Sequence, residues 1–163
     1  MARYDPERHH RRSKRLLGYD YRSPGSYFVT LTMQRRRPLF GAIHGGALLL
    51  SAAGAMLAEH WQALPARFPT MALDEWVVMP DHMHGIVVLR DGTAQAAPAL
   101  GAIIGAFKSL TTNAYIAGVR AQGWPTFEGR LWQRDYYERI VRDEAALRAI
   151  RAYIEHNPQR WKH

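Results

Sequence analysis

The chain has 163 residues, a length that suits one compact domain with its own hydrophobic core. Although 47% of the residues are hydrophobic, no apolar run approaches the roughly 20 residues that a bilayer-crossing helix needs, so we expect no membrane partner. The absence of cysteine excludes disulfides and thiol chemistry, and the lack of an apolar segment after Met1 favours a cytoplasmic location. Lysine and arginine outnumber acidic residues by 22 to 14, and the net charge of +8 favours a polyanionic partner such as nucleic acid.

Basic residues are concentrated at the start of the chain, where residues 1–37 carry ten basic side chains and three acidic ones. We interpret residues 1–26 as a basic N-terminal arm that precedes a single domain over residues 27–163. The arm either contacts DNA phosphates or is a solvated, disordered segment that only adds charge. Under the first interpretation, the DNA-binding residues are basic side chains in and after this arm, with one lysine of a later helix: Arg11, Arg12, Lys14, Arg15, Arg35, Arg36, Arg37 and Lys108.

The first half of the domain predicts a strand, a hairpin and a helix. Residues 27–33 are aromatic and β-branched and follow a Ser-Pro-Gly-Ser turn signal, which predicts a strand. Residues 39–50 contain three glycines between short apolar runs, which predicts a hairpin or a short strand excursion. Ser51 is placed to cap a helix that runs towards Leu64 and stops before Pro65.

The second half predicts two more strands, two helices and a further extended segment. Residues 73–89 predict two antiparallel strands joined at Pro80-Asp81, and residues 91–99 predict a loop. A helix with one apolar face follows, made by Leu100, Ile103, Ile104, Phe107, Leu110 and Ala114. We expect a linker over 123–129, a strand or extended segment over 131–141, and a last helix that Asp143 caps and Pro158 ends. This order predicts an α+β fold with helices packed on one face of an antiparallel sheet, related to the ferredoxin-like split βαβ arrangement.

Two histidines stand at the start of a predicted strand, in the sequence His82-Met83-His84. Side chains two residues apart on a strand point to the same face and are about 6.6 Å apart along it. Both imidazoles can therefore reach one metal ion. Taken alone, the pair is a weak signal, and it is more often two histidines that are exposed or hydrogen-bonded and bind nothing.

The last predicted helix brings Tyr153 and Asn157 to one side of the apolar stripe formed by Leu147, Ile150 and Ile154. If this stripe lays the helix on the sheet, the phenol and the amide are directed along the helix edge towards a neighbouring strand. The alternative is structural, with a half-buried tyrosine whose hydroxyl is satisfied and an asparagine at the helix end.

The other residue types limit the competing chemistries. With no cysteine, no Walker-type glycine-rich loop and no dense carboxylate cluster, thiol catalysis, P-loop hydrolysis and carboxylate-rich two-metal nucleases are poorly supported. Tyr136 and Tyr137 are sheet residues, DNA contacts or an alternative nucleophile. Trp132 and Trp161 belong either to the core or to a surface on which bases stack.

Several segments, taken in combination, carry a family resemblance. They are VVMPDHMHGIVVL (77–89), LWQRDYYERIVRDE (131–144) and YIEHNPQRW (153–161), with further similarity in residues 27–41 and 101–110. The combination resembles the HUH single-tyrosine transposases and, within them, the REP-associated tyrosine transposases of bacteria. The resemblance covers nearly the whole chain, from about residue 19 to residue 161.

The resemblance implies an HUH endonuclease fold, with a divalent metal, Mg²⁺ or Mn²⁺, held by His82, His84 and Asn157. It implies Tyr153 as the nucleophile. Insertion-sequence relatives often carry a glutamine at the place of Asn157. The implied activity is nicking and rejoining of single-stranded DNA at palindromic hairpins such as repetitive extragenic palindromes, through a 5′-phosphotyrosine intermediate. The implied partner is single-stranded or hairpin DNA, bound by a monomer or a homodimer.

The rival hypothesis is a non-catalytic domain that binds single-stranded nucleic acid through an RRM-like sheet with stacked aromatic residues. Such a domain does not need His82, His84, Tyr153 and Asn157 together. The predicted strands also lack an RNP-type aromatic pattern. The sequence therefore favours the enzyme.

Overall fold

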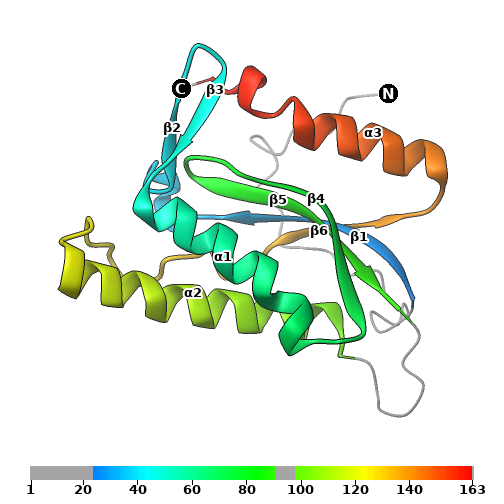
Figure 1. The fold of residues 1–163 in the computed structure, drawn as a ribbon, viewed down its shortest axis with the longest axis horizontal. Helices are drawn as coiled ribbons and strands as arrows, with labels where there is room; N and C mark the ends of the chain where they lie inside the picture. The colour runs from blue at the N-terminus through cyan, green and yellow to red at the C-terminus, as the bar shows by residue number, and fades with distance from the viewer. Residues whose placement is uncertain (1–23, 91–97, 163) are drawn as a thin grey trace.

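The computed structural model describes residues 24–90 and 98–162 of the chain. Its main sheet contains four antiparallel strands in the spatial order β4-β5-β1-β6 (Figure 1). These strands are β1 (Gly25–Thr32), β4 (Met71–Val78), β5 (His82–Leu89) and β6 (Tyr137–Val141). One helix connects β1 to β4 and another connects β5 to β6, which gives the topology of a ferredoxin-like sheet. The predicted α+β fold class is confirmed.

The described residues also form three α-helices and a small second sheet. The helices are α1 (Ala52–Arg67), α2 (Leu100–Gln122) and α3 (Glu144–Glu155), with short 3-10 turns η1 (Gln34–Arg36) and η2 (Pro158–Arg160). The predicted hairpin is formed by β2 (Gly41–His44) and β3 (Ala47–Leu50), and it projects beyond the main sheet (Figure 1). Within the described ranges, no helix combines the length and the apolar character that a membrane-spanning segment requires.

Two helices begin at the predicted N-caps. The side chain of Ser51 accepts a hydrogen bond from the Gly54 N–H at 3.1 Å. The side chain of Asp143 accepts one from the Ala146 N–H at 2.7 Å. Each cap satisfies a backbone donor that the first turn of a helix leaves without a partner.

The predicted end of α1 is wrong, because Pro65 lies inside the helix and the helix continues to Arg67. A proline removes one backbone hydrogen bond from the turn that precedes it. The turn that follows is closed by the Phe68 N–H, which donates to the Leu64 carbonyl at 2.8 Å. The last turn of the helix therefore forms in spite of the proline.

One face of the sheet packs against α1 and α2 and forms the main hydrophobic core (Figure 1). Alternate residues of β1 point to this face, among them Val29 and Leu31, which are fully buried. Trp61 of α1 lies directly on β5, where a Cβ at Gly85 would come within 2.5 Å of its ring. The glycine therefore lets the indole pack against the strand backbone.

The opposite face of the sheet is covered by α3, so the prediction that the helices share one face is wrong (Figure 1). Ile150 and Ile154 of α3 form a smaller apolar cluster with Phe28 of β1 and Ile86 of β5. The physical reason is that β1 and β5 carry apolar side chains on both faces, and a sheet that is apolar on both faces needs cover on both.

The predicted strand over residues 131–141 is shorter in the structure. Regular pairing with β1 begins at Tyr137, and before it a single bridge joins Trp132 to Met33. Most of the predicted loop over residues 91–99 lies outside the described residues. So does most of the basic arm, including four of the predicted DNA-binding residues: Arg11, Arg12, Lys14 and Arg15.

Candidate active site

The histidine pair lies on the face of the sheet that α3 covers. In the register of β1 and β5, His82 lies opposite Thr32 and His84 lies opposite Thr30. Both histidines are buried, and their Nε2 atoms are 3.1 Å apart. The two imidazoles therefore converge on one point, as their spacing on the strand predicted.

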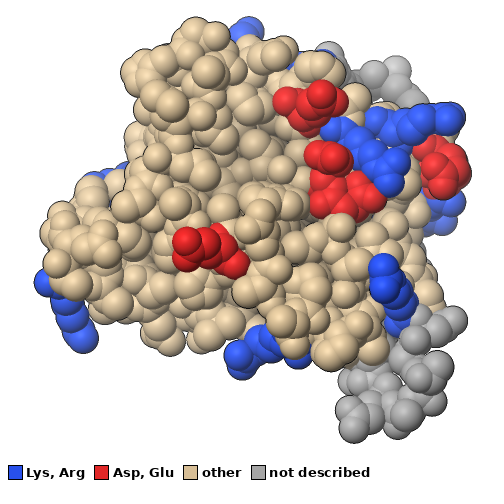
Figure 2. Space-filling model, in the orientation of Figure 1, with Lys and Arg blue, Asp and Glu red and all other residues tan. Residues whose placement is uncertain are grey.

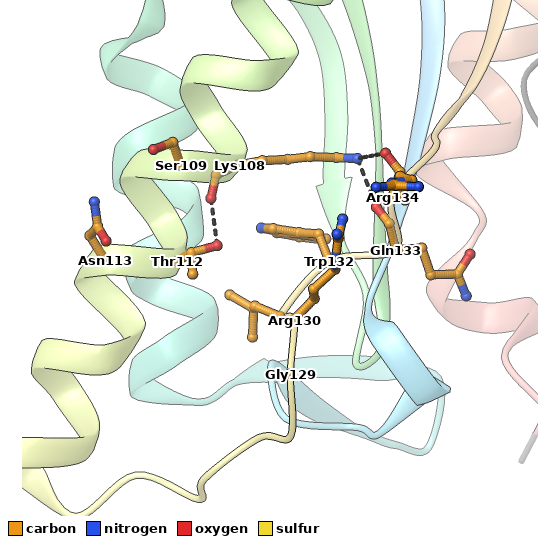
Figure 3. Close-up of a pocket in the computed structure, with 10 residues that line it drawn as sticks. Lys108, Ser109, Thr112, Asn113, Gly129, Arg130, Trp132, Gln133 and Arg134 are labelled. Carbon is orange, nitrogen blue, oxygen red and sulfur yellow. Dashed lines mark hydrogen bonds between the residues drawn. The ribbon is translucent and has the colours of Figure 1, made fainter.

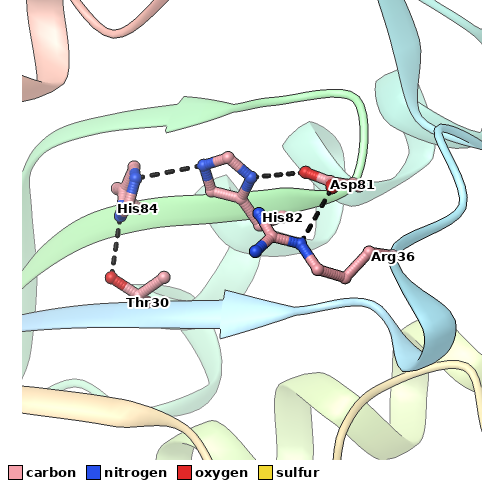
Figure 4. A network of polar contacts seen from close by, with 5 residues as sticks. All are labelled: Thr30, Arg36, Asp81, His82 and His84. Carbon is pink, nitrogen blue, oxygen red and sulfur yellow. Dashed lines mark hydrogen bonds and ion pairs between the residues drawn. The ribbon is translucent and has the colours of Figure 1, made fainter. Parts of the chain in front are cut away.

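Each imidazole is held by a polar partner at its Nδ1 atom, the ring nitrogen that faces away from the other histidine (Figure 4). The Nδ1 of His82 lies 2.6 Å from Oδ1 of Asp81, and the Nε of Arg36 donates to Oδ2 of the same carboxylate at 3.2 Å. The Nδ1 of His84 lies 2.8 Å from the hydroxyl of Thr30. Partners of this kind fix the orientation of metal-ligating histidines and the tautomer that they adopt.

The surroundings of the two imidazoles shift the pKa values of Asp81 and His84. Burial raises the pKa of Asp81, but the hydrogen bond from His82 and the charges of His82 and Arg36 outweigh this effect and leave it below its ordinary value. The carboxylate is therefore ionised and accepts a hydrogen bond from the Nδ1–H of His82. Burial, with a smaller contribution from His82, lowers the pKa of His84 well below its ordinary value and keeps this imidazole neutral.

The geometry of the two imidazoles fits a divalent metal. Two ligands at right angles, with bonds of about 2.1 Å, place their donor atoms about 3.0 Å apart, close to the 3.1 Å between the Nε2 atoms. The hydroxyl of Thr30 can donate or accept, so it supports either tautomer of His84. Among the described residues, no three His, Cys, Asp or Glu side chains are grouped so that they could hold a metal ion.

Tyr153 and Asn157 reach the same place from the C-terminal part of the chain. The ring of Tyr153 lies edge-on to the ring of His84, with centroids 5.3 Å apart, and edge-on to the ring of Phe28. Asn157 is buried just after the end of α3, where its N–H donates to the Ile154 carbonyl at 3.2 Å. A cavity of about 270 Å³ is bounded by both histidines, Tyr153 and Asn157. The structure thus brings together all four residues that the sequence singled out.

Asp81 and Thr30 were missed by the sequence analysis, and Arg36 was predicted only as a DNA-binding residue, not as a neighbour of the histidines. Asp81 lies in the turn before β5, and a carboxylate next to a histidine pair is a signal that could have identified it. Arg36 reaches this carboxylate from η1, which no local pattern predicts. Thr30 is identified only by the register between β1 and β5, which places it opposite His84. Nothing in the sequence of β1 distinguishes this threonine from other strand residues.

The arginines after β1 have partners within the protein. Arg35 pairs with Glu128 at 2.7 Å, Arg36 pairs with Asp81, and Arg37 donates to the Thr126 carbonyl at 2.7 Å. Of these three, Arg36 lies at the wall of the site cavity. Their contact with DNA stays a prediction.

Lys108 lies in a second cavity of about 320 Å³, between the polar face of α2 and residues 129–134 (Figure 3). Its ammonium donates to the carbonyls of Gln133 and Arg134, at 2.9 and 3.3 Å. Burial lowers the pKa of Lys108 to about 8, against the opposing effect of the Asp135 carboxylate. The lysine therefore holds the segment that leads into β6, and DNA binding by Lys108 stays a prediction.

The distribution of charged side chains can be followed on the face of the protein drawn in Figure 2. On the face shown in Figure 2, lysine and arginine side chains are scattered, and acidic side chains lie among them. This face offers no continuous basic patch to a polyanion.

The aromatic residues left open by the sequence have separate positions. Trp132 belongs to the core, and its indole N–H donates to the Thr111 hydroxyl at 3.0 Å. Trp161 is half-buried at the site, and its ring is stacked on that of His82 with centroids 6.0 Å apart. Tyr137 lies on the site face of the sheet, next to Thr30, whereas Tyr136 packs against the main core.

Comparisons with known proteins identify the family of this chain. Residues 57–157, more than half of the chain, match the model of a family described as IS200-like transposases. The chain is 34% identical to an uncharacterized protein of Haemophilus influenzae over 184 residues, which covers 99% of this chain and 95% of the relative.

Two solved structures have a similar fold. One is the structure of a REP-associated tyrosine transposase bound to a REP hairpin, with a TM-score of 0.58 and 23% identity, covering 83% of this chain and 67% of that chain. The other is the crystal structure of a candidate transposase from Deinococcus radiodurans, with a TM-score of 0.52 and 19% identity, covering 87% and 95% of the two chains. The family match includes both histidines, the tyrosine and the asparagine of the site, and the chain belongs to the IS200-like transposase family.

Proposed function

We propose that this transposase is a metal-dependent endonuclease and strand transferase for single-stranded DNA, with Tyr153 as its nucleophile. The observation that carries the proposal is the position of the Tyr153 ring, 5.3 Å from the ring of His84 and in one cavity with His82 and Asn157. A phenol beside two converging imidazoles is an arrangement suited to covalent attack on a phosphodiester.

In the proposed reaction, the phenol oxygen of Tyr153 forms a bond to the scissile phosphorus, and the bond from this phosphorus to the 3′ oxygen of the neighbouring nucleotide breaks. The phenol releases one proton and the 3′ oxygen takes one up, so charge and protons balance. The products are a 5′-phosphotyrosine and a free 3′-hydroxyl. Because a phosphodiester replaces a phosphodiester, a second 3′-hydroxyl can reverse the step and join another strand end.

The residues that would hold the metal are His82, His84 and Asn157. A bound Mg²⁺ or Mn²⁺ supplies positive charge that polarises the phosphate and favours attack. Asp81 and Thr30 hold the two imidazoles so that both Nε2 atoms are aimed at one point. The edge-on contact with Phe28 limits the motion of the Tyr153 ring, which favours a fixed in-line position.

The proposed substrate is hairpin DNA with single-stranded flanks, of the repetitive extragenic palindrome type. Support comes from family membership and from the similar fold of a transposase that was solved with a REP hairpin. The basic residues outside the cavity would hold flanking phosphates, and the protein would act as a monomer or a homodimer. The enzyme would work where DNA is accessible, in the cytoplasm.

The test is a covalent-adduct assay with Mn²⁺ and a labelled hairpin oligonucleotide taken from the DNA that flanks the gene. We expect wild type to form a denaturation-resistant adduct and Tyr153→Phe to form none. Tyr137→Phe loses a phenol hydroxyl on the site face of the sheet and Tyr136→Phe loses one on the core side, and both variants should retain the adduct. An adduct that survives in Tyr153→Phe would show that another residue is the nucleophile.

The same assay separates the enzyme from a domain that only binds nucleic acid. The proposal predicts that EDTA and His82→Ala each abolish the adduct but leave DNA binding measurable. A non-catalytic domain would bind single-stranded DNA equally well with or without chelator and would form no adduct under any condition.

A further inference from the structure

A larger cavity, of about 890 Å³, lies beside the candidate active site, between β2 and the last described residues of the chain. Pro38, Ile43 and Pro80 contribute apolar surface to it. In Figure 1 the C-terminus lies next to the hairpin, and η2 contacts β3. The volume is within the range of about 300 to 1,000 Å³ that is common for ligand pockets.

This cavity adjoins the active-site cavity. Arg36, Trp161 and Lys162 line both cavities. The Trp161 ring is stacked on the ring of His82, so it forms part of the wall between the two spaces. A strand whose phosphate lies beside Tyr153 can therefore continue past Trp161 into the larger cavity.

The lining has the chemistry that an unpaired nucleotide requires. Trp161 offers an aromatic face for a base, and Lys162 offers a cation for a phosphate. The one acidic residue among the described lining residues is Asp81, whose charge is offset by its pairs with Arg36 and His82.

The backbone of β2 adds groups that can recognise a base edge. All four residues of β2, Gly41–His44, line the cavity, and β2 has only β3 as a strand partner in the part of the chain that the structure describes. The outer edge of a strand presents N–H and C=O groups, which match the donors and acceptors along the edge of an unpaired base.

We propose that this cavity binds unpaired nucleotides that flank the scissile phosphate, with Trp161 as the surface on which a base stacks. The inference rests on the proposed function, since it takes the substrate to be single-stranded DNA. It adds a second site, outside the metal and nucleophile, where the enzyme distinguishes one flanking base from another.

The test is a binding experiment in EDTA, so that metal ligation does not enter. The probe is the fluorescein-labelled hairpin oligonucleotide with single-stranded tails, in a series with one abasic position moved along each tail. We expect one or two adjacent abasic positions to weaken binding by wild type about 5- to 150-fold, which is the range for one stacked base. In Trp161→Ala the same abasic positions should have no further effect, and Trp161→Phe should restore their effect in part.

A charge reversal provides a second measurement that does not depend on the tryptophan. Lys162→Glu should weaken binding of the tailed hairpin about tenfold and of a tail-less hairpin little. Arg67→Glu changes the net charge equally at an exposed position at the end of α1, and it should affect neither probe.

The outcomes separate this inference from the proposed function. If wild type forms the Tyr153 adduct but the abasic series is flat, or its effect persists in Trp161→Ala, the cavity does not bind a base and only this inference is overturned. If no adduct forms on any oligonucleotide, the proposed function fails, and a position-dependent abasic effect that is lost in Trp161→Ala would still support a nucleotide site. Stronger binding of a fully duplex probe than of the tailed hairpin would also overturn the inference.

Discussion

The two faces of the sheet differ in what they bury. The face under α1 and α2 is covered by a continuous apolar core in which Trp61, Phe107 and Leu57 are fully buried. The face under α3 has a small apolar cluster, and next to it buried polar groups, His84 among them, that are paired with one another. Burying polar groups is unfavourable unless each has a partner. Apolar residues would stabilise this face more simply, so we attribute the paired polar network to the chemistry of the site. The comparison suggests that one face stabilises the fold and the other positions the reacting groups.

The largest expected effect comes from truncating one apolar residue on each face. Leu57→Ala on α1 and Ile154→Ala on α3 should each lower the free energy of unfolding by about 2–5 kcal/mol, because both side chains are buried. Only Ile154→Ala should slow adduct formation, by about 10- to 100-fold, because this residue seats the helix that carries Tyr153. Urea unfolding gives the stabilities, and adduct rates are compared at a temperature where both variants are folded. An equal loss of rate in Leu57→Ala would show that the two faces are not separate in function.

Local sequence signals predicted most of the elements but not the side of the sheet on which α3 lies. The caps at Ser51 and Asp143 were identified because capping depends on a few neighbouring residues. The apolar stripe of α3 predicts that the helix packs against the sheet, but it does not indicate which face of the sheet the helix covers. A sequence signal was present in the second half of β5, where residues 86–89 are all apolar, because a continuous apolar run indicates a strand covered on both faces.

The candidate site was predictable where its residues share an element or a known motif. The histidines occupy one strand, and Tyr153 and Asn157 belong to one short segment. Arg36 and Thr30 join the site through tertiary contacts across many residues of chain, which no periodicity encodes. The partners of the ligands are therefore the part of the site for which the structure was needed.

The second prediction compares the two groups that orient the histidines. Asp81→Asn should lower the affinity for Mn²⁺ about 10- to 100-fold, because a neutral amide holds Nδ1 of His82 less strongly than a carboxylate does. Thr30→Val should have a smaller effect, less than about tenfold, because the lost partner of His84 is neutral. Calorimetric titration with Mn²⁺ measures both affinities. Asp135→Asn removes the same charge at an exposed position and serves as the control, and an equal loss of affinity there would mean that net charge alone decides.

The smallest expected effect concerns the polar contact that ties α3 to β4. Arg151 donates to both carboxylate oxygens of Asp74, at 2.8 and 2.6 Å, and this hydrogen bonding holds the pKa of Asp74 below its ordinary value of 3.8 in spite of partial burial. Because the folded pKa is the lower one, the contribution to stability is complete well above pH 4 and is lost as the pH falls through the folded pKa. The difference in urea midpoint between wild type and Asp74→Asn should therefore shrink between pH 6 and pH 3, and Arg151→Gln should behave in the same way. A difference that stays constant with pH would mean that α3 is held on its face by the apolar cluster alone, as α1 and α2 are on theirs.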